Sequence, residues 1–465
     1  MLSLRAVACA ALALCLPLDA AKAEEPNKIT IFSEPASGDD FIAGASIVWL
    51  KKGTLPAQLR EVASAFAGSS RDVLGIYETL GGFAVRLSPE AAKQRLSTLR
   101  DPELALIERV EPDGYVELFD TEEFDCNSAT ADDLPTSEYP VAQSYWLGQV
   151  GAPLQPKNAN FTSKVWIVDS GIAKIYNQTA TKELNIDANL SVECNIDGCK
   201  TEANGGVWND KLGHGTMVAG IIGSIKNNSR GFVGVAPGVT LVAVKVFNKN
   251  AKARWTAIYK AIDYVSANAA PSDVVNISWG AQWDPEPYDA SKMNYNPRKI
   301  EEDLRALAAG NKMIRVAIAA GNADQVQNSG YAQTITPGRA GSYYPASGGM
   351  VLTASASDEQ YAFWEYSGFG NGNCNLSNPG SMKCEGPPTF AEPGVKIKSL
   401  WPKQQFNECT GTSFSTAVLS GLLVQRDAIQ PIRQVTGDPS APTTKPSEAD
   451  WLGGCKAVMG TCTEK

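Results

Sequence analysis

The sequence predicts an α/β protein whose larger part is a doubly wound, mostly parallel sheet with helices on both faces, preceded by a small α+β domain. From about residue 140 onward, apolar strand-like runs alternate with segments of helical periodicity, which is typical of parallel strands joined by right-handed crossovers. Polar residues directly follow several of these strands, and such sheets bind ligands at the carboxyl ends of their strands. Between residues 46 and 110 the pattern changes to strand, helix, strand, strand, helix, strand.

The first 23 residues have the three regions of a secretory signal peptide. Arg5 precedes an apolar run over residues 6–18, and Ala21-Lys22-Ala23 supplies a small-residue cleavage site. The apolar run is shorter than the roughly 20 residues that a membrane-spanning helix needs. We therefore expect cleavage after Ala23 and export to the extracellular space or the periplasm, and no membrane partner.

Residues 24–117 are expected to form the small domain. Strands are predicted at 46–50, 73–77, 82–87 and 105–110, and helices at 56–67 and 88–99. Leu59, Val62 and Phe66 recur at helical spacing in the first helix, and Ser88-Pro89 supplies an N-cap and a first-turn proline for the second. The whole segment therefore reads as a split β-α-β unit.

Residues 118–139 are expected to link the two domains. The segment has no hydrophobic periodicity and is rich in Asp, Glu, Ser and Thr, which is typical of a flexible linker that is cleaved during maturation. An ordinary surface loop is the alternative, because no sequence rule fixes the bond that is cut.

Residues 140–426 carry the alternating pattern of the large domain. Strands are predicted at 165–168, 241–247, 274–277 and 313–319. Helices are predicted between them, the first beginning near His214, and another apolar helix follows Ser413. Asp169, Ser278 and Asn322 directly follow predicted strands, so we expect them at one edge of the sheet.

Three separated residues predict nucleophilic catalysis by serine. His214 is the single histidine of the chain, so any imidazole chemistry involves this residue. Asp169 precedes it and Ser413 follows it, which gives the order Asp, His, Ser; a serine nucleophile needs a base to take its proton and a carboxylate to orient that base. The α/β-hydrolase fold is excluded, because its His follows the Ser and its nucleophile motif ends in Gly.

In the segments around Asp169, His214 and Ser413 the chain resembles the subtilisin-like serine peptidases (peptidase S8). The resemblance covers roughly residues 140–426. Further motifs fall in the family's order between the His and Ser blocks: Asn227-Asn228, Gly234-Val235-Ala236-Pro237, 242–246, Asn276-Ile277-Ser278-Trp279-Gly280 and Ala319-Ala320-Gly321-Asn322. The resemblance implies a subtilisin-like fold and an endopeptidase that cuts protein or peptide substrates through an acyl-enzyme.

The resemblance also implies roles for single residues. Asn322 is expected to donate its side-chain amide to the oxyanion, together with the backbone amide of Ser413. The segments Ser278-Trp279-Gly280 and Ala319-Ala320-Gly321 are expected to pair with an extended substrate as added strands. Trp279 stands where the family usually has Leu, so it is expected to narrow a side-chain pocket; a core aromatic residue is the alternative.

Two segments of the small domain, 82–90 and 110–114, resemble the inhibitory propeptide (I9 type) of the proteinase K branch of this family. The resemblance implies a ferredoxin-like domain that assists folding and blocks the cleft, so that the protein is made as a self-processing zymogen. Met217, Glu392, Ala417 and Val418 depart from the family pattern, although none replaces a catalytic group.

Composition limits the partners and cofactors. The net charge of −9, without a basic cluster, argues against nucleic acid, because phosphate binding needs concentrated Lys and Arg. No cofactor is required and no metal site is assigned. Structural calcium stays open without a located site; acidic pairs such as Asp132-Asp133 are more often solvated loops than ligands.

Removal of the signal peptide leaves eight of the ten cysteines, an even number in an exported chain. Eight cysteines allow 105 pairings, of which the short loops Cys194–Cys199 and Cys455–Cys462 are the simplest. A zinc site is not expected, because no Cys-x-x-Cys is present. Residues 427–465 are expected to form a Pro- and Thr-rich tail that ends in the second cysteine pair.

Three functions compete. The leading one is a secreted, monomeric serine endopeptidase. A catalytically silent subtilisin fold that acts as a binding protein is the alternative from another class, and the complete set of Asp169, His214, Asn322 and Ser413 argues against it. An esterase that uses the same triad is the third, and the strand-pairing segments argue for a polypeptide substrate instead.

Overall fold

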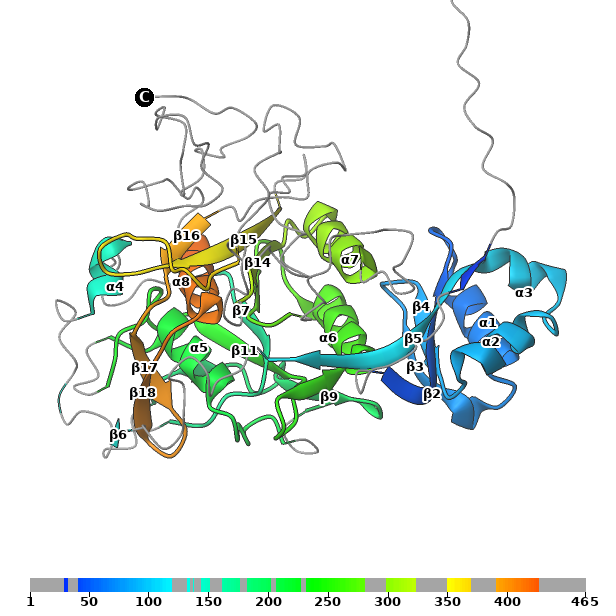
Figure 1. The fold of residues 1–465 in the computed structure, drawn as a ribbon, viewed down its shortest axis with the longest axis horizontal. Helices are drawn as coiled ribbons and strands as arrows, with labels where there is room; N and C mark the ends of the chain where they lie inside the picture. Colours follow the sequence, from blue (N-terminus) through cyan, green and yellow to red (C-terminus); the bar gives the residue numbers. More distant parts are fainter. Residues whose placement is uncertain are drawn as a thin grey trace, which may run out of the picture.

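The computed structural model describes residues 29–31, 41–118, 132–133, 137, 144–150, 161–175, 182–201, 206–226, 231–280, 298–322, 349–368 and 390–425. These residues form a small domain and a large domain that pack against each other (Figure 1). In this part of the chain, no helix is long and apolar enough to cross a membrane. The predicted signal peptide, the tail and the Cys455–Cys462 pair lie outside the described residues.

The small domain is an antiparallel sheet covered by helices. Its strands follow the order β5-β2-β4-β3, and the short β1 pairs in parallel with the outer side of β5. The strands are β1 (Thr30–Ile31), β2 (Phe41–Leu50), β3 (Val73–Tyr77), β4 (Gly82–Val85) and β5 (Ile107–Glu117). The helical elements are α1 (Pro56–Ala67), η1 (Ser70–Asp72), α2 (Pro89–Leu96) and α3 (Asp101–Leu106).

Helical periodicity explains how this domain builds its core. Leu59, Val62 and Phe66 form the buried side of α1, as predicted, and contact strand residues that alternate toward the same face. The Ser88 hydroxyl caps α2 by accepting from the Ala91 backbone amide at 3.2 Å. The second predicted helix, 88–99, is too long: α2 ends at Leu96.

A separate short helix, α3, occupies positions where the sequence predicts the start of a strand. Pro102 lies in the first turn of α3, where the backbone amides have no partner within the helix, so the missing amide of proline costs nothing. The residue before a proline disfavours the helical conformation, so α2 does not continue into α3. The last strand therefore begins at Ile107, two residues later than predicted, and extends to Glu117.

The large domain is built on one sheet that is parallel from β9 to β16. Its order is β10-β9-β11-β7-β13-β14-β15-β16; β8 pairs with β11, and β10 is antiparallel to β9. The strands are β7 (Val165–Asp169), β8 (Asn185–Ile186), β9 (Val192–Asn195), β10 (Gly198–Thr201), β11 (Thr240–Lys245), β13 (Val274–Ile277), β14 (Arg315–Ala319), β15 (Met350–Ser357) and β16 (Phe390–Pro393).

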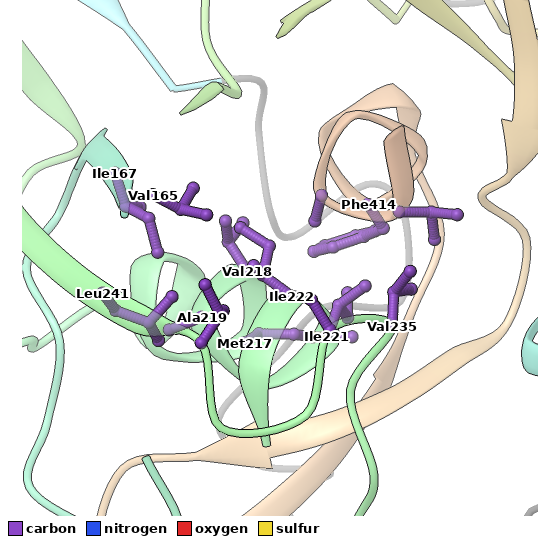
Figure 2. Packing of buried hydrophobic residues seen from close by; sticks show 14 of the residues in the cluster. Val165, Ile167, Met217, Val218, Ala219, Ile221, Ile222, Val235, Leu241 and Phe414 are labelled. Atoms are coloured by element: carbon purple, nitrogen blue, oxygen red, sulfur yellow. The ribbon is translucent and has the colours of Figure 1, made fainter. Parts of the chain in front are cut away.

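Helices cover both faces of this sheet, as predicted. α5 and α8 pack on one face, and α6 and α7 on the other (Figure 1). β7 shows why: Val165 and Ile167 point into the α5/α8 core, and Trp166 and Val168 into the α6/α7 core. Figure 2 shows the first core, with Val218 of α5 between Ile167 and Phe414. The helices are α4 (Tyr145–Gln149), α5 (His214–Gly223), α6 (Trp255–Asn268), α7 (Arg298–Ala309) and α8 (Thr412–Gln425).

A second antiparallel sheet lies beside α5. It consists of β17 (Ile397–Trp401), β18 (Gln405–Cys409) and β6 (Asp132–Asp133). Most of the predicted linker, 118–139, lies outside the described residues, but Asp132 and Asp133 pair with β18. Their side chains are exposed, and no group of three metal-binding side chains occurs in the described part of the chain.

The two domains share one hydrophobic cluster. Trp49 and Tyr77 of the small sheet contact Tyr259 of α6, which also contacts Trp255; the Trp49 and Tyr259 ring centroids are 4.7 Å apart. β5 leaves the small sheet and pairs through residues 115–117 with β12 (Lys252–Arg254) of the large domain (Figure 1). The small domain is therefore docked by both apolar packing and backbone pairing.

Candidate active site

The predicted catalytic residues lie together at the carboxyl edge of the large sheet. Asp169 is the last residue of β7, His214 begins α5, and Ser413 lies in the first turn of α8. Asn322 lies three residues beyond the end of β14. The side chains of Asp169, His214 and Ser413 are buried, so their charges act in a medium of low dielectric constant.

Asp169 and His214 form a close pair. The Nδ1 atom of His214 lies 2.8 Å from Oδ1 and 3.0 Å from Oδ2 of Asp169. The backbone amide of Ser170 also donates to Oδ1 at 2.7 Å, which fixes the carboxylate. A side chain at Gly215 would come within 2.2 Å of the Gly171 carbonyl, so this approach of α5 to β7 requires glycine. The arrangement leaves Nε2 of His214 as the nitrogen that faces away from Asp169.

A second carboxylate, Asp210, builds the loop that holds His214. Its Oδ1 accepts from the Ser170 hydroxyl and the Gly213 amide, both at 2.9 Å. Its Oδ2 accepts from the amide and the hydroxyl of Thr216. Asp210 thus ties the end of β7 to the first turn of α5. This residue was not predicted from the sequence; the one available signal was an Asp four residues before the single His.

The charges around His214 favour its protonated form. Burial alone lowers the pKa of this imidazole, but the negative charges of Asp169 and Asp210 outweigh burial and raise the pKa above 6.5. The raised pKa means that these two charges stabilise the imidazolium that forms when the ring takes a proton. The ring is a neutral base only at a pH above this raised value.

Ser413 lies beside His214 with its hydroxyl turned toward the neighbouring strand. Its Oγ donates to the Ser278 carbonyl at 2.9 Å, and Nε2 of His214 has no hydrogen-bond partner among the described residues. The ring of Phe414, the next residue of α8, is 5.7 Å from the His214 ring. Catalytic hydrogen bonds are often poorly aligned before a substrate binds, so the position fits a nucleophile whose hydroxyl turns toward Nε2.

The orientation of Asn322 is set by α8. Its Oδ1 accepts from the Thr412 amide at 3.0 Å and from the Thr412 hydroxyl at 2.9 Å, which leaves Nδ2 as the outward donor. A Cβ atom at Gly411 would lie 3.1 Å from that Nδ2. The Nδ2 atom therefore lies close to Gly411, two residues before Ser413.

The two predicted substrate-binding segments border this site. The side chain of Ser278 contacts α8: its hydroxyl lies 3.0 Å from the Ser413 carbonyl. In the second segment, the Ala320 amide donates to Ala354 and the Gly321 amide to the Thr412 hydroxyl. These two amides are thus already bonded within the protein, and the Gly321 carbonyl accepts from the Gly368 amide at 2.7 Å. Gly280 and Ala319 lie at the borders of the two segments.

The side chain of Trp279 does not line a pocket beside Ser413. It is fully buried in the α6/α7 core, its Nε1 donates to the Val168 carbonyl at 2.9 Å, and it contacts Phe247 and Trp255. Strand alternation turns this side chain to the face of the sheet opposite α8. These contacts favour the alternative, a core aromatic residue, and only its backbone stays a candidate for substrate pairing.

The comparisons with known proteins assign the chain to a family. The family model described as "Subtilase family" (Peptidase_S8) matches residues 162–431, more than half of the chain. The chain belongs to the subtilase family. Among its relatives, subtilisin DY of Bacillus licheniformis is 29% identical over 266 residues, which cover 57% of this chain and 76% of the relative. Subtilisin E of Bacillus subtilis is 28% identical over 286 residues, which cover 61% of each chain.

A solved structure gives the same fold at low identity. Fervidolysin from Fervidobacterium pennivorans, a keratinolytic enzyme related to subtilisin, aligns with a TM-score of 0.56 at 16% identity and covers 86% of this chain and 57% of that one. The large domain thus has the subtilisin-like α/β fold, and the relatives that it matches by sequence are subtilisins, of which it spans 76% and 61% of the length.

The cysteines give one structural result. Cys194 and Cys199 form a disulfide across the β9–β10 hairpin, one of the two pairings that the short loops predict. The Cys199 sulfur also lies 3.6 Å from the Lys260 carbonyl of α6, so the hairpin is held against that helix.

Proposed function

We propose that the protein is a secreted serine endopeptidase in which Ser413 is the nucleophile, His214 the general base and Asp169 the residue that orients the base. The observation that carries this proposal is the buried contact of 2.8 Å between His214 and Asp169, next to the first turn of α8. Asn322 and the Ser413 backbone amide are the oxyanion donors. Ser278, Gly280 and the segment 319–321 bind the substrate backbone.

The chemistry follows from these positions. The Ser413 oxygen attacks the carbonyl carbon of the scissile bond while its proton passes to Nε2 of His214, and Asp169 stabilises the resulting imidazolium. The negative oxygen of the tetrahedral intermediate lies against Nδ2 of Asn322; one such donor contributes about 3 kcal/mol to the transition state. The imidazolium then gives its proton to the leaving amine, and water repeats the sequence to release the acyl group.

We also propose that the small domain is an inhibitory propeptide of I9 type, as in the proteinase K branch. The strand order supports this proposal: without the short β1, the sheet consists of the fourth, first, third and second strands in chain order, as expected for a ferredoxin-like domain. Asp113 supports docking: its carboxylate accepts from the amide and hydroxyl of Thr256 in the first turn of α6, and from the side chain of Arg254 just before that helix. A carboxylate at a helix N-terminus is stabilising, and here it joins two domains.

The domain boundaries and the fate of the chain belong to the same proposal. A signal peptide (1–23) directs export, the propeptide (24–117) is released by a cut in 118–139, and the peptidase domain (140–426) acts on protein substrates as a monomer. The tail 427–465 completes the proposed organisation, which requires no cofactor and assigns no calcium site. Mass spectrometry of the secreted protein tests these boundaries directly.

A serine-directed phosphonate tests the catalytic proposal. Purified protein should carry the adduct on Ser413 and cleave an internally quenched peptide, whereas Ser413→Ala should do neither. Labelling without peptide cleavage, but with hydrolysis of a nitrophenyl ester, would favour an esterase. A folded protein that neither reacts with the phosphonate nor cleaves peptides after removal of the small domain would favour the silent binding protein.

A further inference from the structure

The helix that carries Ser413 is held to the sheet by a polar contact within an apolar core. Every residue of α8 from 412 to 423 is buried, so no solvent-exposed side fixes its rotation. Two turns after Ser413, the Ser420 hydroxyl accepts a hydrogen bond of 3.1 Å from Nδ2 of Asn276. Asn276 is the third residue of β13 and is completely buried. A buried side-chain amide destabilises the folded state unless it is hydrogen-bonded. Loss of the bond between Asn276 and Ser420 would therefore lower the stability of the fold.

Asn276 is also connected to Ser413 through the hydroxyl of Ser278. Its Oδ1 lies 3.1 Å from the Ser278 hydroxyl, and that hydroxyl lies 3.0 Å from the Ser413 carbonyl. The Ser413 hydroxyl in turn donates to the Ser278 carbonyl at 2.9 Å. The Ser278 hydroxyl has one hydrogen and two acceptors within reach, so it bonds either oxygen. Ser420, Asn276, Ser278 and Ser413 thus form a continuous polar chain from the middle of α8 to its first turn.

Helix geometry couples the orientation of Ser420 to that of Ser413. Ser413 and Ser420 are seven residues apart, about two turns, so both face β13. A bond at Ser420 therefore fixes the rotation that also aims the Ser413 side chain. A rotation of about 15° moves a side-chain oxygen by about 1 Å at the radius of such an atom, and a misplacement of that size can cost about 100-fold in rate.

We propose that Asn276 and Ser420 are positioning residues that set the rotation of α8 and so aim Ser413 at His214. The proposal rests on the proposed function, because it assumes that Ser413 is the nucleophile. Neither residue touches the substrate; both act through the orientation of the helix.

Ser420→Ala is the first test, and Thr416→Val is the matched control. Thr416 also has a buried hydroxyl in α8, but this hydroxyl donates to the Thr412 carbonyl within the helix and does not reach the sheet. Each variant is made as the full chain and normalised to the protein that a phosphonate labels at Ser413. We expect kcat of Ser420→Ala to fall about 10-fold with KM unchanged, and kcat of Thr416→Val to stay within twofold of the wild type.

The double variant Asn276→Val/Ser420→Ala separates positioning from stability. Replacing both partners by apolar groups removes the unpaired amide, so the melting temperature should recover toward that of the wild type. The directional bond is still missing, so kcat should stay about 10-fold low. Recovery of kcat together with stability would overturn the proposal, as would an equal loss in Thr416→Val. Absence of labelling at Ser413 in the wild type would instead refute the proposed function itself.

Discussion

Glu111 of β5 is a buried carboxyl group whose replacement by glutamine is expected to change how stability depends on pH. One of its oxygens accepts from Nε1 of Trp49, and the other has no partner among the described residues. Burial raises its pKa from 4.5 to about 7. The charges that face it are Arg109 on its own strand and Lys299 and Asp303 on α7; the two cations lower the pKa in part, and Asp303 raises it.

The sign and the size follow from the pKa. The folded protein holds this proton up to about pH 7, whereas the unfolded chain releases it near 4.5. The contribution of Glu111 to stability is therefore complete below pH 4.5, declines as pH rises, and is lost above pH 7. A difference of this size corresponds to about 3 kcal/mol. The pKa of Asp303 is also raised to about 7 by burial, so it adds to the same decline.

Urea unfolding between pH 4.5 and 8.5 measures the effect, with Ser413→Ala as the parent so that no self-cleavage occurs. Glu111→Gln should gain stability over the parent as pH rises, reaching about 3 kcal/mol at pH 8. Glu108→Gln removes an exposed carboxylate three positions before Glu111 on the same strand; it is the control and should follow the parent. A stability difference between Glu111→Gln and the parent that is independent of pH would refute the reasoning.

Five further results are expected. Ser413→Ala should abolish both peptide cleavage and release of the small domain, as seen by mass spectrometry; normal release by the purified variant would contradict self-processing. His214→Ala should lower kcat for peptide cleavage as much as Ser413→Ala does, and the double variant should lower it no further, because the pair acts as a unit. The pH–rate profile should rise with a midpoint above 6.5, since His214 must be neutral, and Asp169→Asn should lower that midpoint. Trp279→Leu should lower stability by about 2–4 kcal/mol, since it leaves a cavity and an unpaired carbonyl, and should leave the cleavage preferences in a peptide library unchanged. Asp113→Asn should speed loss of the small domain in a time course on gels, because it weakens the charged cap on α6; an unchanged rate would mean that the apolar contacts alone hold the domain.

The sequence by itself was enough for the fold class and for the candidate catalytic residues. Alternation of two kinds of periodicity is a local property, so it predicted that strands such as β7 are buried on both faces, and the structure confirms helices on both sides. Asp169 and His214 were also predicted from sequence, because the chain has one histidine and because parallel strands end at the same edge.

Only the tertiary structure decided which partner each buried group meets. Trp279 follows a strand that is buried on both faces, so hydrophobicity could not tell whether its ring would line a pocket or fill the core behind the sheet. Asp210 and Asn276 look like ordinary polar residues in the sequence, since their roles come from bonds to groups far along the chain. Local pattern encodes that a residue is buried; the direction it faces, and the atom it bonds, depend on how distant elements pack.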